Sequence, residues 1–170
     1  MPTKKKKKKP ASSPRDAPER PAAGPAFWLF KTEPEEHSWE MQKARGKKGE
    51  PWTGVRNFVA RNNMKAMQLG DLGFFYHTGD EKQVVGIIEV GKTAYPEPKD
   101  ETGMWRCVDV RAVCDMPRPV TLAEVKANPK LAEMALAQKP RLSVQPVTPA
   151  EWNEVCRMGD LDPKSIAAKR

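Results

Sequence analysis

Apolar positions recur along the chain with two periods, every second residue in some stretches and every third or fourth in others. The first apolar run, Phe27-Trp28-Leu29-Phe30, predicts a short strand that Pro34 ends, because proline has no amide hydrogen to donate to a sheet. Further strands are predicted over residues 72–78, 84–92, 105–113 and 142–147. Gly79-Asp80 favour a hairpin turn after the first of these, and Pro146 favours an edge position for the last.

Helical spacing and helix-end signals fall between these strands. Helices are predicted over 38–45, from Val55 to the stop at Gly70, after Thr121, and over 149–158. In the last helix, Thr148 and Glu151 have capping-box spacing, Pro149 takes the first helical position and Gly159 follows the end. About five strands and four helices, out of phase with any βαβ repeat, predict an α+β fold: a strongly curved mixed sheet or small β-barrel flanked by helices.

The positive charge of the chain is concentrated at its ends. Residues 1–26 contain eight Lys or Arg, six of them consecutive, against two Asp or Glu. The last eight residues add three basic side chains, so the net charge of +8 leaves −1 for residues 27–162. A basic, low-complexity segment buries too little apolar surface to order itself. We therefore predict a disordered basic tail over 1–26, one folded domain over 27–160 and a basic C-terminal tail over 161–170.

Composition argues against several classes of protein. No stretch approaches the ~18 consecutive apolar residues of a membrane helix, and no apolar segment follows the basic start as in a secretory signal. The three cysteines are widely spaced, the two histidines lack partners at metal-ligand spacing, and no phosphate-binding glycine loop is present. We expect a monomeric intracellular protein without metal, cofactor or membrane partner, in the cytoplasm or nucleoid of a bacterium or the nucleus of a eukaryote.

One part of the predicted domain is strongly basic. Seven basic residues stand against the single acid Glu50: Lys43, Arg45, Lys47, Lys48, Arg56, Arg61 and Lys65. Trp52 and Phe58 are interleaved with them, which suits phosphate contacts with aromatic stacking, although a solvated loop and helix face would carry the same charges. Trp52 itself lies in a loop of charges and glycines, where its indole either lines a binding pocket or packs on a satellite of the core.

Four ordered blocks of the sequence resemble the EVE-domain family. They are Phe27-Trp28-Leu29-Phe30-Lys31-Thr32-Glu33-Pro34; Trp52 to Phe58 with Ala60 to Met64; Gly70-Asp71 with Phe75-Tyr76-His77-Thr78 and Val85-Gly86-Ile87; and Arg141-Leu142-Ser143-Val144-Gln145-Pro146-Val147. Thr32 stands where the family usually has serine, Thr78 replaces the serine of a His-Ser pair, and Gly79 replaces asparagine. The resemblance implies a PUA-like fold, a β-barrel flanked by helices and related to the YTH readers of methylated adenine.

The resemblance also implies a function, that of a non-catalytic reader of modified bases in DNA or RNA, with cytosine derivatives in DNA favoured. Carried over by position, the residues expected to form the base pocket are Trp28, Lys31, Thr32, Glu33, Trp52, Val55, Arg56, Asn57, His77, Thr78, Leu142, Ser143 and Val144. Arg61 and Lys65 are the expected contacts to neighbouring phosphates, which position a strand without reading its sequence.

Two alternatives remain open at this point. Some related PUA-like domains hydrolyse acylated nucleosides with Lys, Thr and Glu, and Lys31, Thr32 and Glu33 supply those three types. On a regular strand, alternation would place Thr32 on the opposite face from the other two, which argues against an amidohydrolase site. The second alternative is a non-specific RNA-binding adaptor that works mainly through its lysine run.

Overall fold

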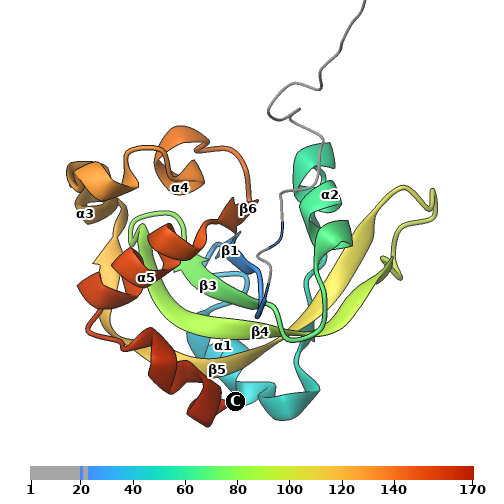
Figure 1. Ribbon diagram of the computed structural model, residues 1–170. Helices are drawn as coiled ribbons and strands as arrows, with labels where there is room; N and C mark the ends of the chain where they lie inside the picture. Colours follow the sequence, from blue (N-terminus) through green and yellow to red (C-terminus); the bar gives the residue numbers. More distant parts are fainter. Residues whose placement is uncertain (1–19, 21–22) are drawn as a thin grey trace, which may run out of the picture.

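The computed structural model describes Arg20 and residues 23–170, and most of the predicted N-terminal tail lies outside these residues. Six strands form one sheet: β1 (Phe27–Thr32), β2 (Glu50–Pro51), β3 (Leu72–His77), β4 (Gln83–Pro96), β5 (Arg106–Thr121) and β6 (Val144–Val147). Their order is β2-β5-β4-β3-β1-β6, with β1 and β3 parallel and the other neighbours antiparallel. The sheet is strongly curled, as Figure 1 shows.

The predicted α+β class, a curved mixed sheet flanked by helices, is confirmed. The sheet does not close into a barrel, because β2 and β6 remain its two edges in the described part of the chain. Two neighbouring strands, β4 and β5, are much longer than the predicted strands over 84–92 and 105–113. Their pairing shifts register at several points. Such bulges bend a strand and increase its twist, which lets two long strands follow the curl of the sheet and hides their alternation in the sequence.

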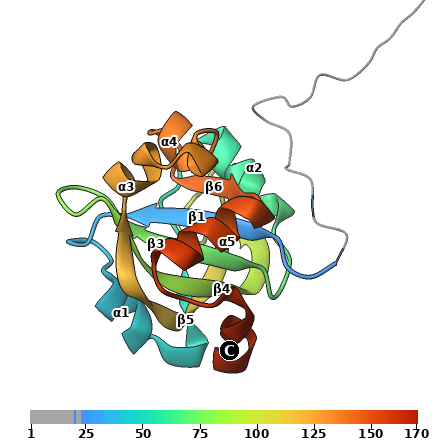
Figure 2. The ribbon, with the colours of Figure 1, turned by 60° about the vertical axis from the view of Figure 1, so that its left-hand side comes forward.

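Helices surround this sheet. The α-helices are α1 (Trp39–Ala44), α2 (Phe58–Ala66), α3 (Leu122–Ala127), α4 (Ala135–Gln138) and α5 (Pro149–Met158), and the 3-10 turns are η1 (Gly46–Lys48), η2 (Pro129–Leu131) and η3 (Pro163–Lys169). Figures 1 and 2 show α3, α4 and α5 grouped together near β6. No helix of residues 23–170 is long and apolar enough to cross a membrane.

Hydrogen bonds from side chains fix where the helices begin. Both predicted capping boxes form, at Thr121 with Glu124 and at Thr148 with Glu151. The helix predicted from Val55 instead begins at Phe58, because the Asn57 side chain accepts a hydrogen bond from the Ala60 amide and makes Asn57 the cap. Residues 52–57 therefore form a loop without regular secondary structure.

Two clusters of buried side chains lie against the sheet. One surrounds Trp152 of α5, whose ring stacks on Phe27 at a centroid distance of 4.5 Å and on Phe74 at 4.1 Å. The other contains Phe30 and Phe75 together with residues of α1, α2 and the loop after β2. Neighbouring side chains of β1 alternate between the two clusters, as the period of a strand requires. The sheet thus separates two cores.

Both ends of the described chain contact the domain. Arg20 lies inside the segment predicted to be disordered, and its guanidinium makes two hydrogen bonds to the carboxylate of Asp71. Residues 161–170 were predicted to be a tail, and within them Pro163–Lys169 form the 3-10 turn η3. Ile166 is 1% exposed, and Arg170 forms an ion pair with Glu89. Leu161 and Ile166 are the buried apolar side chains of this segment, which packs against the domain through them.

Candidate functional site

A cavity of about 400 Å³, called the central cavity below, opens between the end of β1 and three loops. Its lining comes from four stretches that are far apart in the sequence: Lys31, Thr32, Glu33 and Glu36; Trp52, Thr53, Gly54, Val55 and Arg56; Thr78; and Pro140, Arg141 and Ser143. The parallel pairing of β1 with β3 sets Thr32 opposite His77, immediately before Thr78. The amide of Lys31 donates to the carbonyl of Ser143 at 2.9 Å and brings the last stretch to the same place.

Most of the residues expected to form a base pocket meet at this cavity. They are Lys31, Thr32, Glu33, Trp52, Val55, Arg56, Thr78 and Ser143. The regular alternation of a strand had placed Thr32 on the opposite face from Lys31 and Glu33, and that expectation was wrong. Thr32 is the last residue of β1, and the chain turns there, so all three line the same cavity.

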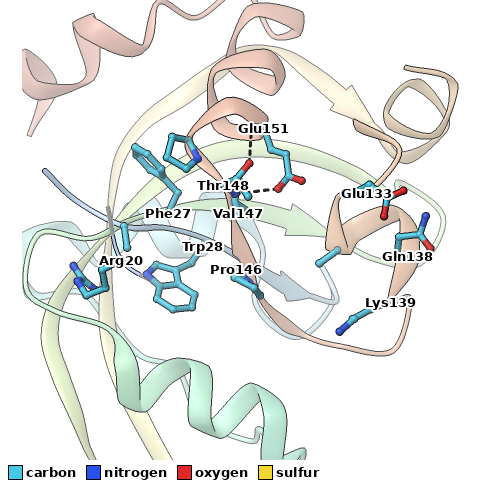
Figure 3. Close-up of a pocket in the computed structure, with 13 residues that line it drawn as sticks. Arg20, Phe27, Trp28, Glu133, Gln138, Lys139, Pro146, Val147, Thr148 and Glu151 are labelled. Carbon is cyan, nitrogen blue, oxygen red and sulfur yellow. Dashed lines mark hydrogen bonds between the residues drawn. The ribbon is translucent and has the colours of Figure 1, made fainter. Parts of the chain in front are cut away.

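The other expected pocket residues lie elsewhere. Trp28 is 1% exposed, donates its indole N–H to Asp71 at 3.0 Å, and borders a separate cavity of about 530 Å³ (Figure 3). Asn57 caps α2 and, with Leu142, borders a third cavity of about 360 Å³. Val144 is fully buried. The sequence alone does not show which way the side chains at these positions point.

His77 supports the wall without lining the central cavity. Its Nε2 accepts the backbone N–H of Trp39 at 3.0 Å, which leaves Nδ1 as the ring nitrogen that can donate. That nitrogen lies 2.7 Å from Oε1 of Glu81 and donates to it, and the bond lowers the pKa of Glu81. His77 thus holds the first turn of α1 against the end of β3.

Trp52 combines the two roles left open by the sequence. Its side chain is 7% exposed and meets Phe30 edge-on at a centroid distance of 5.2 Å and Phe75 at 5.7 Å. Its backbone amide donates to the carbonyl of Val108 at 2.7 Å. The indole also borders the central cavity and a smaller one of about 220 Å³. Trp52 is therefore a core residue that also forms part of a cavity wall. Its packing against Phe30 and Phe75 restrains the indole.

The loop after Trp52 is held by a carboxylate from a distant part of the chain. Glu97, in the hairpin between β4 and β5, is 3% exposed. It accepts the amide N–H of Gly54 at 2.5 Å and the guanidinium of Arg56 at 2.6 Å. The Arg56 hydrogen bond lowers the pKa of Glu97, which stays ionised. Sequence analysis did not find Glu97, because its partners are more than 40 residues away.

Both acidic and basic groups line the central cavity. The neighbouring Glu36 raises the pKa of Glu33. Lys31, which lines the same cavity, is half-buried and donates from Nζ to the carbonyl of Pro140 at 2.9 Å, and burial lowers its pKa. Carboxylates accept hydrogen bonds and ammonium groups donate them. The cavity therefore offers both kinds of partner to the edge of a polar heterocycle.

Sequence analysis also missed Glu36, Thr53, Gly54, Pro140 and Arg141, which all line the central cavity. Each lies within three residues of one that it did select, in a loop whose path only the fold fixes. Among residues 20 and 23–170, no group of His, Cys, Asp and Glu is arranged to hold a metal ion.

Three of the seven basic residues of the 43–65 cluster are paired with acidic side chains of the protein. Ion pairs join Lys43 to Asp115 at 3.0 Å and Arg45 to Glu50 at 2.8 Å, in addition to the pair made by Arg56. Arg61, an expected phosphate contact, donates to the side chain of Asn62 and the carbonyl of Met104 and packs on the rings of Phe58 and Trp105. Lys65, the other expected contact, is exposed at the end of α2.

Comparison with known proteins finds relatives of this chain. Human thymocyte nuclear protein 1 is 34% identical over 170 aligned positions, covering 81% of this chain and 76% of the human protein. The crystal structure of an Agrobacterium tumefaciens protein is 58% identical, with a TM-score of 0.78 over 81% of this chain and 95% of that chain. The human THYN1 protein, crystallised in complex with 5-methylcytosine containing DNA, is 34% identical with a TM-score of 0.71 over 81% and 99% of the two chains. The model of the EVE domain matches residues 26–158, and the chain belongs to the EVE-domain family.

Proposed function

We propose that this protein is a reader of modified cytosine in DNA and that the central cavity receives the modified base. The observation that carries the proposal is the convergence of Trp52, the carboxyl pair and Lys31 on one cavity of about 400 Å³. The crystal structure of the 34% identical human protein with 5-methylcytosine containing DNA supports it. Cavities of a few hundred cubic ångströms with an aromatic wall and a few polar groups are typical of small-ligand sites.

Energetics are consistent with this reading. A base in a duplex reaches a cavity only when it flips out, which costs a few kcal/mol in lost stacking and pairing. Stacking on one aromatic side chain returns about 1–3 kcal/mol. The exocyclic amino group of cytosine is a hydrogen-bond donor, so the carboxylates of Glu33 and Glu36 suit it as acceptors.

A substitution that fills the cavity tests the proposal. Thr53 is exposed and lines the cavity, so Thr53→Trp places an indole there without disturbing the core. The variant is expected to lose its preference for a duplex with one 5-methylcytosine over the unmodified duplex, measured by fluorescence anisotropy. Thr93→Trp, on an exposed part of β4, is the matched control and should keep the preference. An unchanged preference in Thr53→Trp would refute the assignment of the cavity.

One observation supports a second candidate, hydrolysis of an acylated nucleoside. Lys31, Thr32 and Glu33 all line the central cavity, so the three side-chain types used by related hydrolases meet there. Incubation with N4-acetylcytidine and detection of released acetate tests this activity. Turnover that Lys31→Ala abolishes would establish the hydrolase, and absence of turnover together with binding of the modified duplex would favour the reader.

A further inference from the structure

Another cavity, not yet described, adjoins the central one and differs from it in charge. It measures about 340 Å³ and is lined by Lys31, Tyr76, Thr78, Gly79, Lys82, Leu122, Lys126, Leu136, Ala137 and Pro140. We call it the lysine cavity, because three lysines line it and no acidic residue does. Lys31, Thr78 and Pro140 belong to both cavities and form the wall between them. A ligand could therefore occupy both cavities if it passed over these three residues.

The cations of the lysine cavity are free to act on a ligand. Lys82 and Lys126 form no ion pair with any of the described residues, whereas Lys43, Arg45 and Arg56 of the 43–65 cluster each do. Lys31 uses one of its three ammonium protons on Pro140. Lys82 also has a φ of +48°, a conformation that favours glycine or asparagine, and the sequence nonetheless has lysine there. Nothing in the described fold neutralises these charges.

Tyr76 supplies a neutral donor on the floor of the same cavity. Its side chain is 3% exposed, and its hydroxyl has no hydrogen-bond partner among the described residues. Oε1 of Gln145 is the only fully buried side-chain polar atom of those residues that lacks a partner, so the Tyr76 hydroxyl is not fully buried, and Tyr76 lines the lysine cavity. Burial raises the pKa of Tyr76 to about 12, which keeps the hydroxyl protonated at neutral pH.

We propose that the lysine cavity binds a backbone phosphate of the strand whose modified base occupies the central cavity. This inference rests on the proposed function and extends it. Ammonium groups and a phenolic hydroxyl are donors, and a phosphate offers only acceptors. A base and its own phosphate are joined through one sugar, which fits two cavities that share a single wall. The phosphate also favours the charged form of Lys31, whose pKa burial lowers.

The site lies on a different surface from the one expected from the sequence. Arg61 on α2 is engaged with Asn62 and Met104, whereas Lys82 precedes β4 and Lys126 belongs to α3. The strand would therefore enter the central cavity from the α3 side, next to Pro140.

A double variant, Lys82→Ala/Lys126→Ala, tests the proposal in the full chain. Loss of a phosphate contact is expected to weaken binding about tenfold at low salt for modified and unmodified duplexes alike. The slope of log affinity against log salt should fall by about 1, the value for one phosphate. The preference for the modified base should not change. Lys130→Ala/Lys164→Ala removes the same charge from residues that line neither cavity and should have a smaller effect.

Neutral linkages identify the ligand. With a methylphosphonate in place of the phosphate on one side of the modified cytosine, wild type and the double variant should bind equally well. Equal affinity and equal salt slope of the two proteins on the unmodified backbone would overturn the phosphate assignment. Competition by inorganic phosphate, with no effect of a methylphosphonate on either side of the modified cytosine, would also overturn it. If wild type showed no preference for the modified base, the proposed function itself would fail, whatever the lysine variant did.

Discussion

The carboxylate of Glu97 and the guanidinium of Arg56 form an ion pair at 2.6 Å although 41 residues separate them in the sequence. The same carboxylate accepts the amide of Gly54, so one buried side chain holds two residues of the loop that borders the central cavity. This contact joins the hairpin between β4 and β5 to a loop that lines the cavity. Glu97 thereby restrains the loop that follows Trp52, and a restrained loop keeps the cavity wall in place for a stacked base.

We expect Glu97→Gln to lower the free energy of unfolding by roughly 1–2 kcal/mol, because the buried acceptor loses its charge. The effect is limited because the Arg56 guanidinium is partly exposed and stays hydrated. Urea unfolding measures the change. Glu101→Gln, in the exposed turn of the same hairpin, is the control and should leave stability within experimental error. Equal stability of wild type and Glu97→Gln would show that the loop is held by other contacts.

The same pair predicts a pH dependence. The folded-state pKa of Glu97 is lowered, chiefly by Arg56, so the pair stabilises the protein above the unfolded pKa of about 4.3 and the stabilisation is lost as pH falls through the lower folded value. The difference in unfolding free energy between wild type and Glu97→Gln should therefore be constant near neutral pH and shrink below about pH 4. A difference that grew as pH fell would contradict the assignment.

Trp52 and Trp152 are expected to respond alike in stability and differently in binding. Both are packed, at 7% and 1% exposure, so truncation of either to Ala should cost about 3–5 kcal/mol. Trp52→Phe and Trp152→Phe keep an aromatic ring and allow binding to be measured on folded protein. Only Trp52→Phe should weaken binding of the modified duplex, because only Trp52 borders the central cavity. Loss of binding in Trp152→Phe alone would indicate that the binding site lies near the cluster around Trp152 and not at the central cavity.

Local patterns predicted the elements of this fold well and the connections between them poorly. The capping boxes at Thr121 and Thr148 depend on residues three positions apart, and both formed as expected. The start of α2 was misplaced by three residues, because apolar spacing continues through Val55 while the cap at Asn57 decides the boundary. β4 and β5 were underestimated because bulges break their alternation.

The candidate site was predicted where motif residues lie next to the cavity and missed where only the fold brings them there. Thr32 shows the limit of strand alternation, which fails at the last residue of a strand. Glu97 shows the limit of local reasoning, since no pattern near it points to Gly54 or Arg56. Tyr76 was quoted within a motif, yet its unpartnered hydroxyl becomes visible only with the cavity around it.

The C-terminal segment should contribute to stability. Ile166 is 1% exposed in the cluster around Trp152, so Ile166→Ala is expected to cost about 2–4 kcal/mol. Lys164→Ala, on the exposed side of the same turn, should change the unfolding free energy by less than about 0.5 kcal/mol. Thermal and urea unfolding of both variants measure this. Equal stability of Ile166→Ala and wild type would return residues 161–170 to the status of a tail.

Deletion of residues 1–19 should separate general from specific binding. This truncation removes the six consecutive lysines and keeps Arg20, which contacts Asp71. Because lysines release counterions from any phosphate backbone, the deletion should weaken binding to all oligonucleotides and flatten the salt dependence. Preference for a modified base should survive. Loss of that preference with the tail would favour the adaptor over the cavity.

The central claim is that one cavity recognises a modified cytosine, and the ratio of two dissociation constants tests it most directly. The two duplexes are identical except for one cytosine, which is 5-methylcytosine in the first, and both are titrated into the wild-type protein at the same salt concentration. Burial of one methyl group is worth about 0.8 kcal/mol, so the methylated duplex should bind about fourfold more tightly or better. Equal dissociation constants for the two duplexes would contradict the account.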